Sequence, residues 1–201
     1  MKKTYVLFLL LASLLLALGC NKSNEELEIN DFKGLYRITS ILSSKAIDLN
    51  NDNNKSNNYL QEIKSDFITF NGQIINCNYD NNVKNNFAEA RPATAIQNNT
   101  KFLDLRFPIQ RIDSLYQGNN DYEIINMDYK KITTGFIYKL LGNNVEIESD
   151  PFDHFKFYKI KNFYINRLNK NEFEAKFDFN VYDFMDKKWV ETNLKVQYAK
   201  Q

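Results

Sequence analysis

Oxygen-bearing side chains recur at every second position of one short segment, and this spacing could bind a hard cation. Asp48, Asn50 and Asp52 supply the first three oxygens, and Asn54 continues the series. Carboxylate and amide oxygens at positions one, three and five of a loop can converge on Ca²⁺. The sixth position of such loops is usually glycine, and Asn53, which stands there in this chain, can adopt the same turn.

The end of this segment departs from the calcium-binding pattern. The twelfth position, where a bidentate glutamate is needed, is Tyr59, and Glu62 is the nearby carboxylate that a helical turn could bring back. The sequence therefore predicts a calcium site whose ligands are Asp48, Asn50, Asp52, Asn54 and Glu62. The alternative is a series of Asx turns, in which Asn and Asp bond to the backbone without a metal, and this is the more common use of these residues. No other cofactor is expected.

Residues suited to catalysis are few. The chain has one histidine, so no H-E-x-x-H zinc site can form, and a histidine-based triad would depend on His154 alone. His154 is expected to be a solvated loop residue, and Cys77 a small strand residue rather than a nucleophile. Asp178 and Asp183 could serve a glycosidase, but outward-facing carboxylates on a strand are ordinarily a solvated face. We therefore expect a protein that is not an enzyme.

The first twenty residues have the composition of an export signal that ends in a lipid-attachment cysteine. Lys2 and Lys3 precede an apolar run, which is shorter than the ~18 to 20 residues that a membrane-spanning helix needs. The ending Leu-Ala-Leu-Gly-Cys resembles the lipobox of bacterial lipoproteins, although Ala17 and Leu18 depart from the usual order. The resemblance implies removal of residues 1–19 and acylation of Cys20, which would hold the protein on a lipid bilayer. An ordinary secretory signal that is cut nearby is the alternative.

Residues 20–32 are expected to form a flexible tether between the lipid and a single domain over residues 33–201. The tether has few apolar residues and several like charges. Its acidic residues Glu25, Glu26 and Glu28 resemble the tract that directs lipoproteins of the Bacteroidota type to the outer face of the outer membrane. We therefore expect an outer-membrane lipoprotein on the periplasmic or the cell-surface face, with the acidic tract favouring the surface.

The charge balance of the chain argues against nucleic acid as a partner. Removal of residues 1–19 leaves 24 basic and 25 acidic side chains, so the mature protein lacks the basic field that phosphate binding needs. With Cys20 committed to lipid, Cys77 alone cannot form an internal disulfide. The fold must then depend on its core, for which the 14% aromatic content supplies bulky side chains.

Alternation of apolar and polar residues predicts that the domain is built from antiparallel strands. The pattern is clearest over residues 173–181 and 190–198, which should form a long hairpin. Helical signal is limited to residues 59–64 and 108–117. We predict an all-β, antiparallel up-and-down β-barrel with one or two short helices. The other expected strands cover residues 34–42, 66–70, 73–79, 102–107, 131–141, 145–149 and 155–165.

The first third of this domain resembles a known family. The segments 34–38 (GLYRI), 48–52 (DLNND), 58–63 (NYLQEI) and 67–70 (FITF) are similar to the opening of the lipocalin-like lipoproteins of Bacteroidota. In that family a Gly-aromatic strand leads through an acidic loop and a short helix into a second strand. The resemblance implies a small lipocalin-like barrel whose interior can hold an apolar ligand.

The predicted hairpin offers two different binding surfaces. Its inward side chains would either line a ligand cavity or fill the barrel. Trp189 falls on the opposite face, where it would be exposed to a glycan or a protein, unless it packs under a loop. We expect a membrane-anchored binding module for a small apolar or amphipathic molecule, or, alternatively, a surface module for a glycan or an envelope protein. The inward residues are Phe173, Phe177, Phe179, Leu194 and Val196.

Overall fold

The computed structural model describes most of the chain from Phe32 onward. Residues 34–201 form one compact unit. No described helix is long and apolar enough to cross a membrane. Cys20, the acidic tract and Cys77 lie outside the described residues, so the predictions about them stay predictions. The described ranges are 32–63, 67–70, 73–76, 87–92, 101–118, 121–142 and 144–201.

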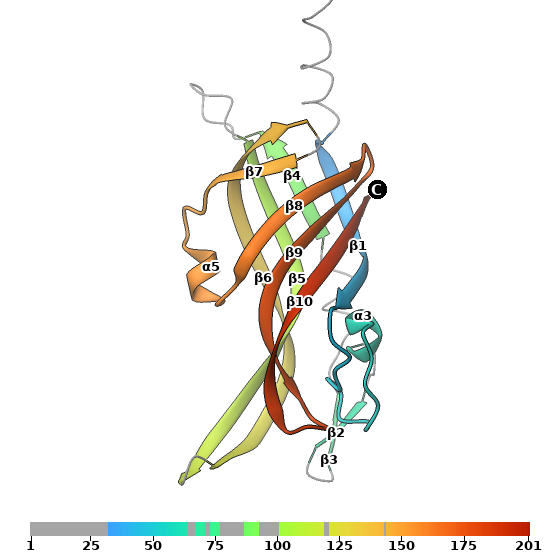
Figure 1. Cartoon of the computed structure of the whole chain (residues 1–201), viewed down its shortest axis with the longest axis vertical. Coiled ribbons are helices and arrows are strands. Elements are labelled where there is room, and N and C mark those ends of the chain that lie inside the picture. The colour runs from blue at the N-terminus through green and yellow to red at the C-terminus, as the bar shows by residue number, and fades with distance from the viewer. Residues whose placement is uncertain are drawn as a thin grey trace, which may run out of the picture. The chain divides into compact units, whose positions relative to one another are not determined.

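Eight of the strands pair into a closed antiparallel barrel, which confirms the predicted fold class (Figure 1). These strands are β1 (Gly34–Ser43), β4 (Phe87–Pro92), β5 (Lys101–Gly118), β6 (Asp121–Leu141), β7 (Asn144–Ser149), β8 (Lys161–Asn169), β9 (Glu172–Asp183) and β10 (Lys188–Lys200). From β4 to β10 each strand pairs with the next in sequence, and β1 lies between β10 and β4 to close the ring. A separate two-stranded sheet consists of β2 (Phe67–Phe70) and β3 (Gln73–Asn76), and the short helices are α3 (Tyr59–Glu62) and α5 (His154–Phe157).

The β9–β10 hairpin has the register that the alternating sequence predicts. Its pairs run from Lys188 opposite Asp183 to Ala199 opposite Glu172. The inward aromatic residues pack on other rings of the core: Phe173 stacks on Tyr198 with centroids 4.7 Å apart, and Phe177 lies 4.7 Å from Phe107. Offset and edge contacts of this kind add to the stabilisation from apolar burial. The inward face of this hairpin therefore forms part of the barrel core.

The helix predicted over residues 108–117 is wrong, because β5 continues through it to Gly118. The spacing of Ile109 and Ile112 matches a helical face, but the whole segment pairs with β6, and Pro108 lies opposite Lys131. The backbone N–H of Gln110 points away from β6, to the Tyr59 hydroxyl. The backbone nitrogen of Pro108, two residues earlier, therefore faces the same unpaired edge of β5. A strand tolerates proline there, because no sheet hydrogen bond is lost.

The strand predicted over residues 155–165 is also wrong in its first half. Asp150 accepts a hydrogen bond from the backbone N–H of Phe155 at 3.0 Å, and its other oxygen lies 2.8 Å from His154 Nδ1. These bonds favour a turn, so the segment begins as α5 and becomes β8 only at Lys161. His154 is consequently a partly buried partner of Asp150 rather than a solvated loop residue.

A buried polar network joins one end of the barrel to the loop that contains α3. The Gln110 amide accepts from Tyr182 N–H at 2.7 Å and donates to Tyr182 C=O at 3.1 Å, so it links β5 to β9, which are not neighbours in the sheet. The Tyr129 hydroxyl donates to Leu49 C=O at 2.9 Å. Figure 1 shows this loop beside the lower part of β1, near the β9–β10 turn. Phe184 N–H donates to Asp48 C=O at 2.9 Å and fixes that contact.

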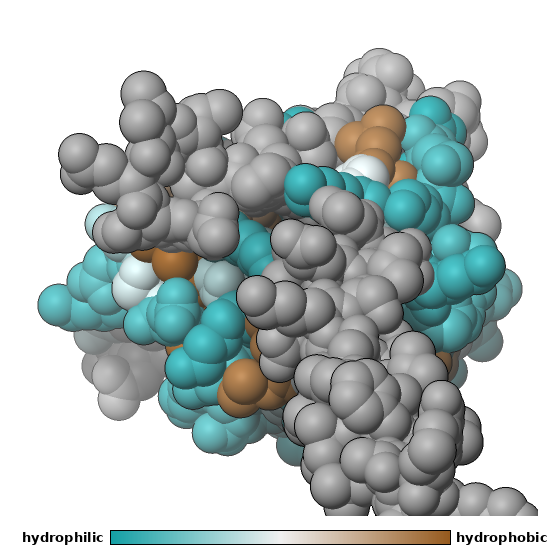
Figure 2. Space-filling model, turned by 90° about the horizontal axis from the view of Figure 1, so that it is seen from above, coloured by the Kyte–Doolittle hydropathy of each residue, from teal (hydrophilic) through white to brown (hydrophobic). Residues whose placement is uncertain are grey.

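Figure 2 shows the opposite end of the barrel. Seen from above, the described residues there are mainly hydrophilic, with isolated hydrophobic residues among them (Figure 2). Single exposed apolar side chains are normal on a water-exposed surface.

Candidate functional site

The three carboxylates among the five predicted calcium ligands converge in the structure. Carboxylate oxygens of Asp48, Asp52 and Glu62 all lie within 4.8 Å of one another. We call residues 48–62 the carboxylate loop. Glu62 reaches the cluster because α3 turns the chain back, as the sequence analysis predicted: Asn58 caps the helix by accepting from Gln61 N–H at 3.1 Å.

The carboxylate loop also contains the predicted Asx turns. Asp48 accepts from the N–H groups of Asn51 at 2.7 Å and of Asn53 at 3.2 Å. Both asparagines have left-handed backbones, which asparagine tolerates better than most residues. Asn50 accepts from Asp52 N–H at 3.1 Å, and Asn54 N–H donates to Asp52 at 2.8 Å. The turns hold the loop and do not decide whether a cation binds, so the calcium site stays a prediction.

Burial makes negative charge costly in this cluster. Asp48 and Glu62 are buried, and desolvation raises the pKa of Glu62 to about 7. Leu49 N–H, which donates to Glu62 at 3.2 Å, opposes this rise, whereas the charges of Asp52 and Asp48 add to it. Desolvation also raises the pKa of Asp48, although it accepts several backbone N–H bonds. A proton or a bound cation would relieve the repulsion between the three carboxylates.

The lysine within the carboxylate loop is engaged by other acids. Lys55 Nζ lies 2.9 Å from Asp183 and 2.6 Å from Asp186. Asp183 is buried, so its predicted solvated position is wrong; the loop that carries Lys55 covers it. Asp178, five residues earlier in β9, falls on the other face and accepts from Asn193 at 2.9 Å. Asp178 and Asp183 therefore do not form a carboxylate pair.

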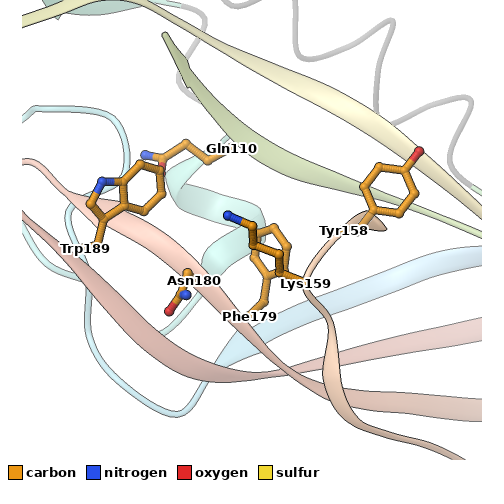
Figure 3. Close-up of a pocket in the computed structure, with 6 residues that line it drawn as sticks. All are labelled: Gln110, Tyr158, Lys159, Phe179, Asn180 and Trp189. Carbon is orange, nitrogen blue, oxygen red and sulfur yellow. The ribbon is translucent and has the colours of Figure 1, made fainter. Parts of the chain in front are cut away.

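A second candidate site is a pocket of about 380 Å³ at the open edge of β9 (Figure 3). Pockets of this size hold small molecules. We call it the edge pocket. The pocket forms because the pairing between β8 and β9 ends at Asp178. The rest of β9 therefore has no paired strand on that side. Its lining residues are Gln110, Tyr158, Lys159, Phe179, Asn180 and Trp189.

The edge pocket contains two residues that the sequence analysis assigned to different surfaces. Trp189 is 57% exposed, which is one of the two positions that the sequence left open, and its indole meets the Tyr182 ring edge-on at 5.7 Å. Phe179 is 8% exposed and belongs to the inward face of β9. The other inward residues, which were expected either to line a cavity or to fill the barrel, are at most 1% exposed and pack in the core; they are Phe173, Phe177, Leu194 and Val196.

The remaining lining residues were missed by sequence reasoning. Gln110 was placed on a helix, and Tyr158 and Lys159 were placed in a strand. No sequence signal marks these residues, because the long-range bonds of Gln110 and the Asp150 turn bring them to the pocket. Asn180 had only its outward position in β9 to identify it, and it is indeed exposed.

Comparisons with protein-family models, curated proteins and solved structures found no match to this chain.

The raised pKa of Glu62 predicts that stability falls as the pH rises. The folded protein keeps the Glu62 proton up to about pH 7, whereas the unfolded chain releases it near its ordinary pKa of 4.5. Between these values the folded state binds more protons, so the free energy of unfolding decreases with increasing pH. Glu62→Gln can still accept from Leu49 N–H without a charge. At pH 8 without calcium, urea unfolding should show this variant to be about 1–3 kcal/mol more stable than the wild type.

The Glu62→Gln variant also tests the predicted calcium site. At pH 8, calcium should raise the melting temperature of the wild type and leave Glu62→Gln unchanged. Glu146→Gln, which removes an exposed carboxylate on β7, is the matched control and should respond to calcium like the wild type. A wild type that melts at the same temperature in calcium and in chelator would rule out the calcium site. A Glu62→Gln variant without extra stability at pH 8 would contradict the assigned pKa.

Proposed function

We propose that this protein is a non-catalytic binding module of the bacterial envelope that holds a small amphipathic molecule in the edge pocket. The observation that carries this proposal is that Phe179 and Trp189 share one pocket of about 380 Å³. Two aromatic side chains offer a large apolar contact area with little loss of conformational freedom. A flat or short-chain apolar group would be desolvated between them, while its polar end faces the rim.

A binding surface for a glycan or an envelope protein is the second candidate. It is favoured by the exposure of Trp189, because exposed indoles commonly stack on sugars or anchor protein partners. The two functions need different residues. A small molecule inside the pocket needs both Phe179 and Trp189, whereas a surface partner needs Trp189 and should be indifferent to Phe179.

We also propose that Cys20 is acylated and anchors the module to the outer membrane. The proposal is supported by the sequence at residues 1–20, and the acidic tether favours the cell-surface face. Protein extracted from membranes with detergent should have the intact mass of residues 20–201 plus two or three acyl chains. The Cys20→Ser variant should lose the acyl mass, and a variant that kept it would contradict the anchor.

Binding in the edge pocket can be followed directly, because Trp189 is the one tryptophan of the chain. Phenylnaphthylamine, a neutral aromatic probe, should accept excitation energy from Trp189 when it binds. Phe179→Ala should weaken binding about tenfold, since loss of the ring removes roughly 1.4 kcal/mol or more of apolar contact.

Phe157→Ala is the matched control for this titration. Phe157 is 76% exposed on α5 and does not line the edge pocket. Its truncation should leave the probe affinity unchanged. Equal affinities of Phe179→Ala and the wild type would contradict the pocket. If glycan binding were then lost in Trp189→Ala and kept in Phe179→Ala, the surface function would be favoured.

A further inference from the structure

We infer that the edge pocket selects an amphipathic anion, whose negative group is bound by Lys159. This inference rests on the proposed function of the pocket and names the chemistry of its ligand. The ligand would combine an aromatic or alkyl body with one carboxylate, sulfonate or phosphate group. The body would lie against Phe179 and Trp189, and the anionic group would meet the lysine.

The backbone on both sides of Lys159 is held in place. Lys159 N–H donates to Lys156 C=O at 3.2 Å, and the next residue, Ile160, is buried and donates to Phe155 C=O at 2.8 Å. Lys159 itself has a left-handed φ of 54°. A residue other than glycine, asparagine or aspartate is uncommon in the left-handed region of backbone conformation and costs free energy there. Lys159 therefore extends from a turn that backbone hydrogen bonds hold in place.

Figure 3 shows where the side chain points. The Lys159 ammonium group is directed toward the side of the pocket where Trp189 and Gln110 lie, and the Tyr158 hydroxyl points away from the other lining residues. The Gln110 amide is already bonded to both backbone groups of Tyr182. Lys159 is therefore the lining group best placed to bind a polar atom of a ligand, with the exposed amide of Asn180 near it at the rim.

The described acidic residues near the pocket do not serve as counter-ions for Lys159. None of the six lining residues is acidic. The neighbouring acids are engaged elsewhere: Asp153 faces Lys156 at 3.8 Å, Asp150 binds His154, and Glu191, opposite Asn180 in the sheet, binds Lys161 at 2.6 Å. No described carboxylate forms an ion pair with Lys159. Lys159 is exposed, so its ammonium group is open to the anionic end of a ligand whose apolar body lies against the aromatic rings.

Two variants separate the charge of Lys159 from its unusual backbone. Lys159→Asn removes the charge and keeps a residue that accepts a left-handed φ, so the turn should survive. Lys159→Arg keeps the charge and should retain binding. Lys156→Asn removes a lysine three residues away, whose side chain is 85% exposed and does not line the pocket, and is the matched control.

The test uses two probes that share one ring system and differ in charge: anilinonaphthalene sulfonate and neutral phenylnaphthylamine. Both are titrated into the full-length protein, with energy transfer from Trp189 as the signal and circular dichroism as the check on folding. In Lys159→Asn, the affinity for the sulfonate should fall about five- to tenfold, while the affinity for the neutral probe stays the same. Added salt should weaken sulfonate binding in the wild type and have little effect in Lys159→Asn.

The outcomes distinguish this inference from the function on which it rests. If Phe179→Ala weakens both probes and Lys159→Asn changes neither, the pocket binds ligands and the anion preference is overturned. If Lys156→Asn weakens the sulfonate as much as Lys159→Asn does, the effect is general surface charge and the inference is also overturned. If neither probe receives energy from Trp189, or Phe179→Ala has no effect on either, the edge pocket itself fails as a binding site.

Discussion

The buried side chain of Gln110 holds one end of the barrel together. Its amide bonds to the N–H and the C=O of Tyr182 and so connects β5 to β9, two strands that the sheet does not pair. Its own backbone N–H donates to the Tyr59 hydroxyl at 3.1 Å, which brings α3 against the same strand. Buried polar groups that lose their partners cost about 1–3 kcal/mol each. The strands and the loop at this end therefore depend on one residue that is 4% exposed.

Both candidate sites are built on this connection. On one side, the Leu49 C=O accepts from the Tyr129 hydroxyl and the Leu49 N–H donates to Glu62. These two bonds attach the carboxylate loop to the buried polar network. On the other side, Tyr182 contacts Trp189, and Gln110 forms part of the wall of the edge pocket. The barrel core above them, filled with rings such as Phe173 and Phe177, serves as a scaffold. The two candidate sites thus lie at the edge of β9 and in the carboxylate loop.

The sequence predicted the features that depend on neighbours along the chain. Period-two alternation identified β9 and β10, and the spacing from Asp48 to Glu62 anticipated the convergence of carboxylates. Prediction from the sequence failed where contacts between residues far apart in the chain decide the structure. Ile109 and Ile112 have the spacing of a helical face, and the pairing with β6 nevertheless makes this segment a strand. The turn that places Lys159 depends on side-chain bonds of Asp150, which compete with the strand preference of the following aromatic residues.

Hydrogen exchange of the Tyr182 amide, followed by NMR, tests most directly whether Gln110 closes this end of the barrel. In the wild type this amide should exchange slowly, because its N–H is held by Gln110. In Gln110→Ala it should exchange at least about tenfold faster, since the variant loses both bonds to Tyr182. Gln117→Ala, which removes an exposed glutamine from the same strand, should leave the rate unchanged. Equal protection of Tyr182 in the wild type and in Gln110→Ala would contradict the role assigned to Gln110.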